Sequence, residues 1–166
     1  MSPFQSDFER DYYSWVGLYI STWAGVETNL ALIVQMIFEH LDGKLIEKDC
    51  PQSLSRRLKF LRKASGKLDA LSNEKDEIYA LTDTLSSESN FRHDIVHGIK
   101  TSIGFSDHKS IMVARPVAIN DPLGEIVRTN VSLAILEEKY QILGLSGLSL
   151  MGLGRRIINL IDKERE

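Results

Sequence analysis

The segment from Arg92 to Gly98 carries the residue types with the clearest chemical potential in this chain of 166 residues. Its arginine and its second histidine, Arg92 and His97, stand five positions apart. Arginine stays cationic in proteins, whereas histidine gains and loses its proton near neutral pH. Such a pair can hold a phosphate group and move a proton beside it. The segment therefore predicts a phosphate-directed site with Arg92 and His97 as its working residues.

The spacing of this pair says how the site would be built. Residues five apart on an ideal helix lie about 140° apart around the axis and about 7.5 Å along it. The arginine side chain must then extend toward the turn that carries His97, and Gly98 predicts that the helix ends just after it. The unpaired carbonyls of a helix end favour a charged imidazole. Between the two lie His93 and Asp94.

The elements that must position this segment are predicted to be mainly helical, because apolar residues recur at helical spacing in four stretches. Short β-type pieces interrupt the pattern between the third and fourth stretches. The expected helices cover about 6–41, about 51–68, 72 or 73 to about 99, and about 130–163 with a break near 144–147; the expected β pieces are 102–105, 111–113 and 125–127. We expect one all-α domain over residues 1–166, an antiparallel bundle of four to five helices with a small β-hairpin insertion at about 100–130.

Two charged residues lie on stripes that are otherwise apolar. Arg92 shares a stripe with Ile78 and Leu85, and Glu27 is the only charged residue between Trp15 and Phe38. A charge that faces a core needs a partner or a ligand. A contact between Glu27 and Arg92 would satisfy both, either as a structural ion pair or with Glu27 orienting Arg92 or His97 at a polar site.

Composition limits the classes of function. The net charge of −3 indicates that any nucleic-acid contact depends on a local patch, and the single cysteine, Cys50, excludes an internal disulfide. The run from Trp15 to Phe38 is long enough to suggest a membrane span, but its scattered polar residues favour a buried helix. The N-terminus lacks a basic leader, which predicts no secretory signal and a cytoplasmic protein.

A local positive patch is present in the second predicted helix. Six cations and no acid lie between Pro51 and Leu68. Five of them are candidate RNA contacts through their attraction for phosphates: Arg56, Arg57, Lys59, Arg62 and Lys63. The alternative is an ordinary solvated helix face.

The Arg-x4-His pattern at the end of a third helix, followed by Gly98, resembles the signature of the HEPN superfamily. The opening helix, with Glu27 in Trp23-Ala-Gly-Val-Glu-Thr-Asn-Leu30, is similar to the long first helix of that family. One departure is His93, where the family often has Asn. The resemblance implies a metal-independent endoribonuclease without cofactors, acting as a homodimer with the two motifs facing each other. In it, His97 would assist attack of the ribose 2′-hydroxyl on the phosphate or protonate the leaving oxygen, and Arg92 would neutralise the phosphoryl charge. His93 and Asp94 would shape the hydrogen bonds around these two residues. Many small proteins of this type are toxins or defence factors neutralised by an antitoxin protein.

Three other hypotheses remain open. A non-catalytic module of the same kind would bind a nucleotide, RNA or a protein through the same pocket. His93 and His97, four apart on one helical face, could share a zinc ion, although no third ligand and no HExxH signature lie nearby. A helical interaction protein would use Arg92 and Glu27 only structurally.

Overall fold

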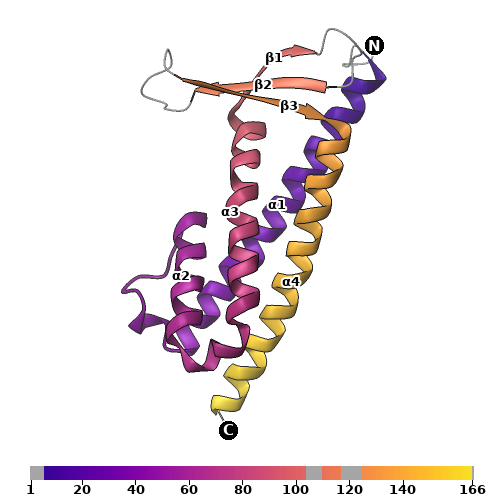
Figure 1. Ribbon diagram of the computed structural model, residues 1–166. Coiled ribbons are helices and arrows are strands. Elements are labelled where there is room, and N and C mark those ends of the chain that lie inside the picture. The colour runs from indigo at the N-terminus through magenta and orange to yellow at the C-terminus, as the bar shows by residue number, and fades with distance from the viewer. Residues whose placement is uncertain (1–5, 104–109, 117–124, 166) are drawn as a thin grey trace. The chain divides into compact units, whose positions relative to one another are not determined.

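The computed structural model describes residues 6–103, 110–116 and 125–165. Within these residues the chain is mainly helical, with four α-helices and one three-stranded antiparallel sheet (Figure 1). The elements are α1 (Asp7–His40), α2 (Leu54–Lys67), α3 (Lys75–His97), β1 (Ile99–Ile103), β2 (Ser110–Pro116), β3 (Ile126–Ser132) and α4 (Leu133–Arg165), with short 3-10 segments at Gly43–Leu45 and Asp69–Glu74. The expectation of a mainly helical protein with a β insertion is confirmed.

The described residues form two compact units, each assembled from separate stretches of chain. The first, here called the sheet unit, contains residues 6–21, 88–103, 110–116 and 125–142. The second, the α2 unit, contains residues 22–87 and 143–165. The helices α1, α3 and α4 each contribute residues to both units. The expectation of one domain over residues 1–166 stays a prediction.

The core of the sheet unit lies under one face of the sheet. Alternation along β2 and β3 turns Ile111, Val113 and Val131 to this face, where all three are buried. They pack with Tyr12 of α1 and Leu136 of α4, and partly buried apolar residues complete the cluster: Phe8, Trp15, Val16, Phe91, Ile95 and Leu133. The sheet therefore lies against the start of α1, the end of α3 and the start of α4 (Figure 1).

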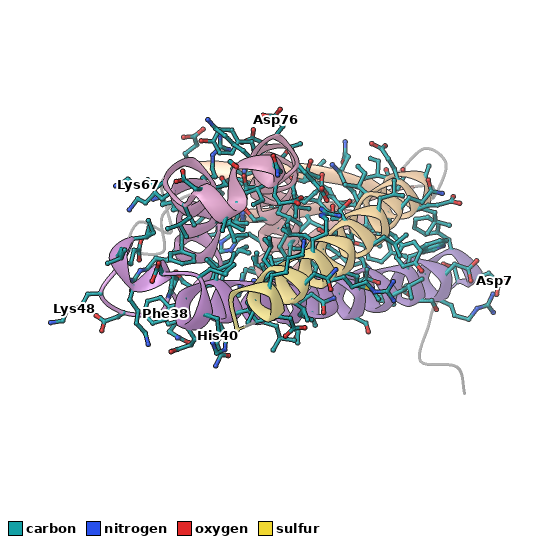
Figure 2. All side chains as sticks on the ribbon, turned by 90° about the horizontal axis from the view of Figure 1, so that it is seen from below. Asp7, Phe38, His40, Lys48, Lys67 and Asp76 are labelled. Atoms are coloured by element: carbon teal, nitrogen blue, oxygen red, sulfur yellow. The ribbon has the colours of Figure 1, made fainter. Side chains whose placement is uncertain are left out.

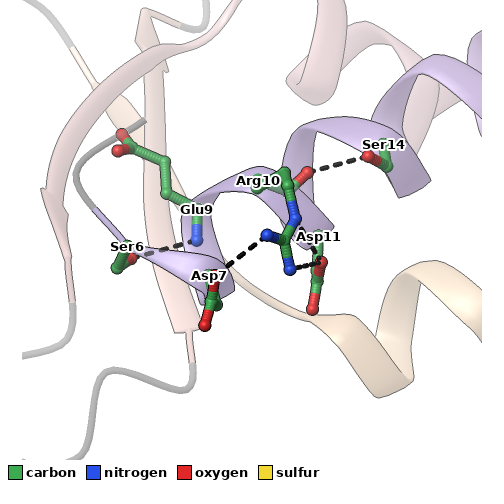
Figure 3. A network of polar contacts seen from close by, with 6 residues as sticks. All are labelled: Ser6, Asp7, Glu9, Arg10, Asp11 and Ser14. Atoms are coloured by element: carbon green, nitrogen blue, oxygen red, sulfur yellow. Dashed lines mark hydrogen bonds and ion pairs between the residues drawn. The ribbon is translucent and has the colours of Figure 1, made fainter. Parts of the chain in front are cut away.

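The first turn of α1 shows how local polar contacts set the direction of one acidic side chain. The Ser6 hydroxyl accepts a hydrogen bond from the Glu9 backbone N–H at 3.1 Å, as an N-cap does. Arg10 pairs with Asp7 at 2.9 Å and with Asp11 at 3.2 Å, while the Glu9 carboxylate points away from that network (Figure 3). Glu9 is buried and forms its ion pair with Lys100 of β1 instead. The start of α1 is thereby joined to the edge strand of the sheet.

The insertion differs from the expected hairpin. It contains three strands in the order β1-β2-β3, because β1 pairs with β2 directly after α3 ends. Ile99, expected on the last turn of the third helix, is the first residue of β1 and is exposed. A hairpin is marginal by itself, whereas a third strand and an apolar face give a sheet independent stability.

Two helix boundaries also differ from expectation. The third helix begins at Lys75 rather than at Ser72 or Asn73, because the 3-10 segment Asp69–Glu74 precedes it. The last helix does not break near residues 144–147, and α4 is continuous. A glycine in a helix costs only about 1 kcal/mol, and the buried Leu143 and Leu150 on either side hold the helix in the core.

The α2 unit is built around a buried aromatic and aliphatic core. Trp23, Phe60 and Ile78, from three different helices, are each at most 1% exposed. The rings of Phe38 and Phe60 lie 6.3 Å apart, while His40 and Lys67 lie at the surface (Figure 2). Ser53 caps α2 by accepting a hydrogen bond from the Arg56 backbone N–H. The helix was expected from about residue 51, with Pro51 in its first turn, and it begins at Leu54.

Candidate functional site

Four of the five residues of the predicted site, Arg92, His93, Asp94 and His97, lie on the last two turns of α3, within the sheet unit. The helix ends at His97 as predicted, and the Gly98 N–H donates to the Asp94 carbonyl at 2.8 Å. A side chain at position 98 would begin 2.1 Å from Val113 Cγ1 and 2.4 Å from the Asp94 carbonyl oxygen. Glycine is required here because the sheet packs directly against the end of the helix.

The two histidines form the exposed part of the site. The rings of His93 and His97 lie 4.6 Å apart at an angle of 51°, and both side chains are exposed. Desolvation by neighbouring atoms lowers the pKa of His93, and the charges of Arg115, His97 and Arg92 lower it further, against the opposing effect of Asp94. His93 is therefore held in its neutral form more strongly than an ordinary histidine.

Arg92 is half-buried and keeps its guanidinium uncommitted. Within the described part of the chain it has no hydrogen bond or ion pair. Its charge opposes the effect of desolvation and of Glu88 on Tyr19, whose pKa is nevertheless raised well above the ordinary value. Arg92 is thus a half-buried cation that no acid among the described residues neutralises.

The acid one turn before Arg92 is already paired. Glu88 is buried and accepts a hydrogen bond from Lys139 Nζ of α4 at 2.8 Å. Lys139 also lies over the ring of Phe91, 5.7 Å from its centroid. The charge of Glu88 is therefore balanced across the two helices, which leaves that of Arg92 available.

The Asp94 carboxylate is bonded to two strands of the sheet. It is buried and accepts hydrogen bonds from Arg115 Nε of β2 and from Thr129 Oγ1 of β3, the latter at 2.8 Å. Asp94 therefore joins the last turns of α3 to two strands. The expectation that it shapes the hydrogen bonds around Arg92 and His97 stays a prediction, and the contacts that the structure gives it are with the sheet.

Arg115 and Thr129 were not found from the sequence. A usable pattern existed, because Arg115 follows Ile111 and Val113 at the period of two that puts all three on one face of a strand. A charge on the apolar face of a strand demands a partner, just as it does on a helix. The partner itself lies 21 residues away in the chain, so periodicity could not name it.

Glu27 belongs to the α2 unit, in which it is half-buried. It lines a shallow surface pocket together with Arg57 and Gln35. Within the described residues Glu27 has no ion pair, and its expected contact with Arg92 stays a prediction.

Three of the six cations of α2 form ion pairs with acids of their own unit. Glu47 pairs with Arg56 at 3.1 Å and with Lys63 at 3.3 Å. Although desolvation acts in the other direction, these two hydrogen bonds lower the pKa of Glu47. Arg62 pairs with Asp83 and lies 4.6 Å from the ring centroid of Tyr79.

The remaining α2 cations differ in their surroundings. Arg57 Nε donates to the Pro51 carbonyl at 3.3 Å. Lys59 and Lys67 are exposed and have no ion pair to any described residue. The positive face predicted from the sequence is therefore partly neutralised.

A metal centre requires more ligands than the two histidines supply. Across residues 6–103, 110–116 and 125–165, no group of three or more His, Cys, Asp or Glu side chains gathers in a position to hold a metal ion. Asp94, the acid adjacent to His93, is already bonded to Arg115 and Thr129. The described residues thus give the zinc hypothesis no third protein ligand.

Comparisons with protein-family models, with curated proteins and with solved structures give no match. None of the described helices combines the length and the apolar character that crossing a bilayer demands.

Proposed function

We propose that the protein is a metal-independent endoribonuclease of the HEPN type, with Arg92 and His97 as its catalytic residues. The observation that carries the proposal is the presence of two side chains on the last two turns of α3. One is the half-buried guanidinium of Arg92, which has no ion pair among the described residues, and the other is the exposed imidazole of His97. The fold proposed with it is the antiparallel HEPN bundle, of which the mainly helical architecture is one requirement.

The reaction would use the nucleophile within the RNA. The 2′-hydroxyl oxygen attacks the adjacent phosphorus, the bond to the 5′-oxygen breaks, and a 2′,3′-cyclic phosphate and a 5′-hydroxyl result. One group takes the proton of the 2′-hydroxyl and another gives a proton to the leaving oxygen. The contact between His93 and His97 places two imidazoles side by side, and the lowered pKa of His93 keeps its ring in the neutral form that can accept a proton. Arg92 would stabilise the charge that develops on the phosphoryl oxygens.

A second copy of the chain would complete the site across a two-fold axis, as the family resemblance implies. Exposed apolar residues of the α2 unit support self-association, since Leu145, Leu148 and Met151 of α4 are 66%, 65% and 54% exposed. The last two lie beside an apolar groove that also contains Gly144 and Gly147. The proposal further includes a cytoplasmic location, an antitoxin protein as inhibitor, and RNA contacts by Arg57 and Lys59 of α2.

The test is cleavage of mixed RNA by the purified protein in the presence of a chelator. We expect cyclic phosphate ends, and we expect His97→Ala to lower kcat by about 10² to 10⁴, the range for loss of a general acid or base. The matched control is His40→Ala, because His40 is also exposed and also ends a helix. Equal cleavage by the two variants would contradict the proposal.

A non-catalytic RNA-binding module is the second candidate. One observation favours it: Arg92 can hold a phosphate regardless of whether the histidines transfer protons. Retention of RNA without cleavage, lost on Arg92→Ala and kept on His97→Ala, would support binding alone.

A further inference from the structure

The sheet unit holds another arginine beside the end of α3 that the proposed mechanism does not use. Arg115 comes from β2, 18 residues beyond His97 in the chain. Its Nε donates to Asp94, and for its terminal Nη atoms the described residues offer no hydrogen bond or ion pair. A guanidinium has five donors in a planar fork, so an arginine bound through Nε alone retains most of its capacity for an anion.

Arg115 is held in one place rather than left mobile on the surface. Its side chain is 16% exposed, and that of Asp94 is 11% exposed. Thr129 Oγ1 donates to the second oxygen of the same carboxylate, so both oxygens of Asp94 are occupied by neighbouring strands. An arginine held by a buried carboxylate loses little further conformational freedom when it binds a ligand.

The position of Asp94 places Arg115 at the histidines. Asp94 directly follows His93 and precedes His97 by three residues on α3. The charge of Arg115 acts on His93, where it is the strongest influence on the pKa after desolvation and exceeds that of Arg92. Arg115 from the sheet and Arg92 from the helix are therefore both near enough to His93 to lower its pKa.

We infer that Arg115 contacts an RNA phosphate at this site together with Arg92, and that Asp94 and Thr129 position it. The inference rests on the proposed function, because it adds a residue to that same site. Its consequence is that the β insertion is part of the binding site. The sheet brings the second cation to the helix end, and Gly98 permits the close approach.

Binding without cleavage provides the test. The probe is a single-stranded RNA of mixed sequence with 2′-fluoro sugars, which lacks the nucleophile of the proposed reaction. We expect Arg115→Gln to weaken binding of this probe roughly tenfold, the effect of losing one charge-assisted hydrogen bond. The slope of log K against log salt should fall by about 0.7, as for one fewer phosphate contact on a single strand.

The matched control is Arg128→Gln. Arg128 lies on β3, is exposed, and pairs in register with Ala114, so it faces the opposite side of the sheet from Arg115. We expect it to change binding less than twofold. Equal binding by Arg115→Gln and Arg128→Gln would overturn the inference.

A conservative variant of Arg115 controls for the effect of leaving Asp94 without a positively charged partner. Arg115→Lys keeps a positive charge for Asp94 and removes the planar fork, so we expect a folded protein that binds the probe about threefold to tenfold more weakly. Wild-type binding by Arg115→Lys together with a folded, fully binding Arg115→Gln would count against Arg115. Asp94→Asn, which leaves Arg115 in the chain but frees it, should weaken binding as Arg115→Gln does.

The cleavage assay separates this inference from the proposed function. If wild type cuts RNA and His97→Ala does not, yet Arg115→Gln binds the probe normally, the inference fails and the nuclease stands. If neither wild type nor His97→Ala cuts RNA, but Arg115→Gln weakens probe binding, the nuclease fails and the Arg115 contact stands. Absence of probe binding by wild type overturns both.

Discussion

The end of α3 and the face of α2 are both rich in cations, but they differ in what those cations already hold. On α2, Arg56 and Lys63 share Glu47, and Arg62 pairs with Asp83. At the end of α3, Arg92 has no ion pair among the described residues, and the acid beside it holds Arg115 through Nε alone. The number of positive residues in a segment therefore says little about anion binding until their partners are known.

The acids of the two regions differ as well. Asp94 is buried between a helix and two strands, whereas Asp83 has a side chain that is 69% exposed. An exposed pair is screened by water and salt and contributes little, whereas loss of one partner of a buried pair leaves the other charge unsatisfied. We expect the same type of ion pair to have unequal effects on stability in the two regions.

The largest expected effect separates the two regions by catalysis. Arg92→Ala should lower kcat for RNA cleavage by about 10² to 10³, because it removes the donor proposed to stabilise charge on the phosphoryl oxygens. Arg62→Ala should lower it less than about threefold, since Arg62 is committed to Asp83 and Tyr79. Single-turnover cleavage of one RNA by both variants is the measurement. Equal losses would remove the distinction drawn between the regions.

The next effect concerns stability. Asp94→Asn should lower the free energy of unfolding by about 3 kcal/mol, because Arg115 would lose its charged partner in a mostly buried place. Asp83→Asn should change it by less than about 0.5 kcal/mol. Urea denaturation of the two variants gives both values. A loss from Asp83→Asn as large as that from Asp94→Asn would show that burial does not decide the difference.

The smallest expected effect is a pH dependence at His93. The pKa of His93 is lowered in the folded chain, so the unfolded chain binds more protons between the two pKa values. Stability from this residue is therefore complete above the ordinary histidine pKa of about 6.5 and is lost as the pH falls through the folded pKa. His93→Gln should flatten the stability profile in this range.

The matched control for this profile is His40→Gln, at the exposed end of α1. It should leave the fall in stability below pH 6.5 unchanged. Urea midpoints measured between pH 5 and 7.5 compare the two variants with wild type. A steeper acid loss in His93→Gln than in wild type would contradict the assigned direction.

Much of the helical architecture could be predicted from the sequence. The first helix was expected at about residues 6–41 and covers Asp7–His40, and the stripe of Ile78, Leu81 and Leu85 is buried as its spacing predicts. Helical periodicity is a local property, because residues three or four apart share one face whatever else the chain does. The end of α3 at His97 could also be predicted locally, from Gly98 directly after it.

Helical periodicity could not predict the features that depend on contacts between distant parts of the chain. Gly144 was expected to break the last helix, but buried leucines on either side keep α4 continuous. Three β pieces were expected in the insertion, with a hairpin as their arrangement. The structure pairs all three strands in one antiparallel sheet, in which the register between β1 and β2 is irregular. Both outcomes depend on packing and pairing with parts of the chain that are distant in the sequence.

The sequence by itself determined which residues could do chemistry and which helix carries them, because the identity and spacing of Arg92, His93 and His97 are local facts. Only the tertiary structure decided which charged side chains already have partners. Asp94 could have served the histidines, but it holds Arg115 and Thr129, 21 and 35 residues away. Ion pairs form between whichever opposite charges folding brings together, and the burial that makes them matter exists only once the core has formed.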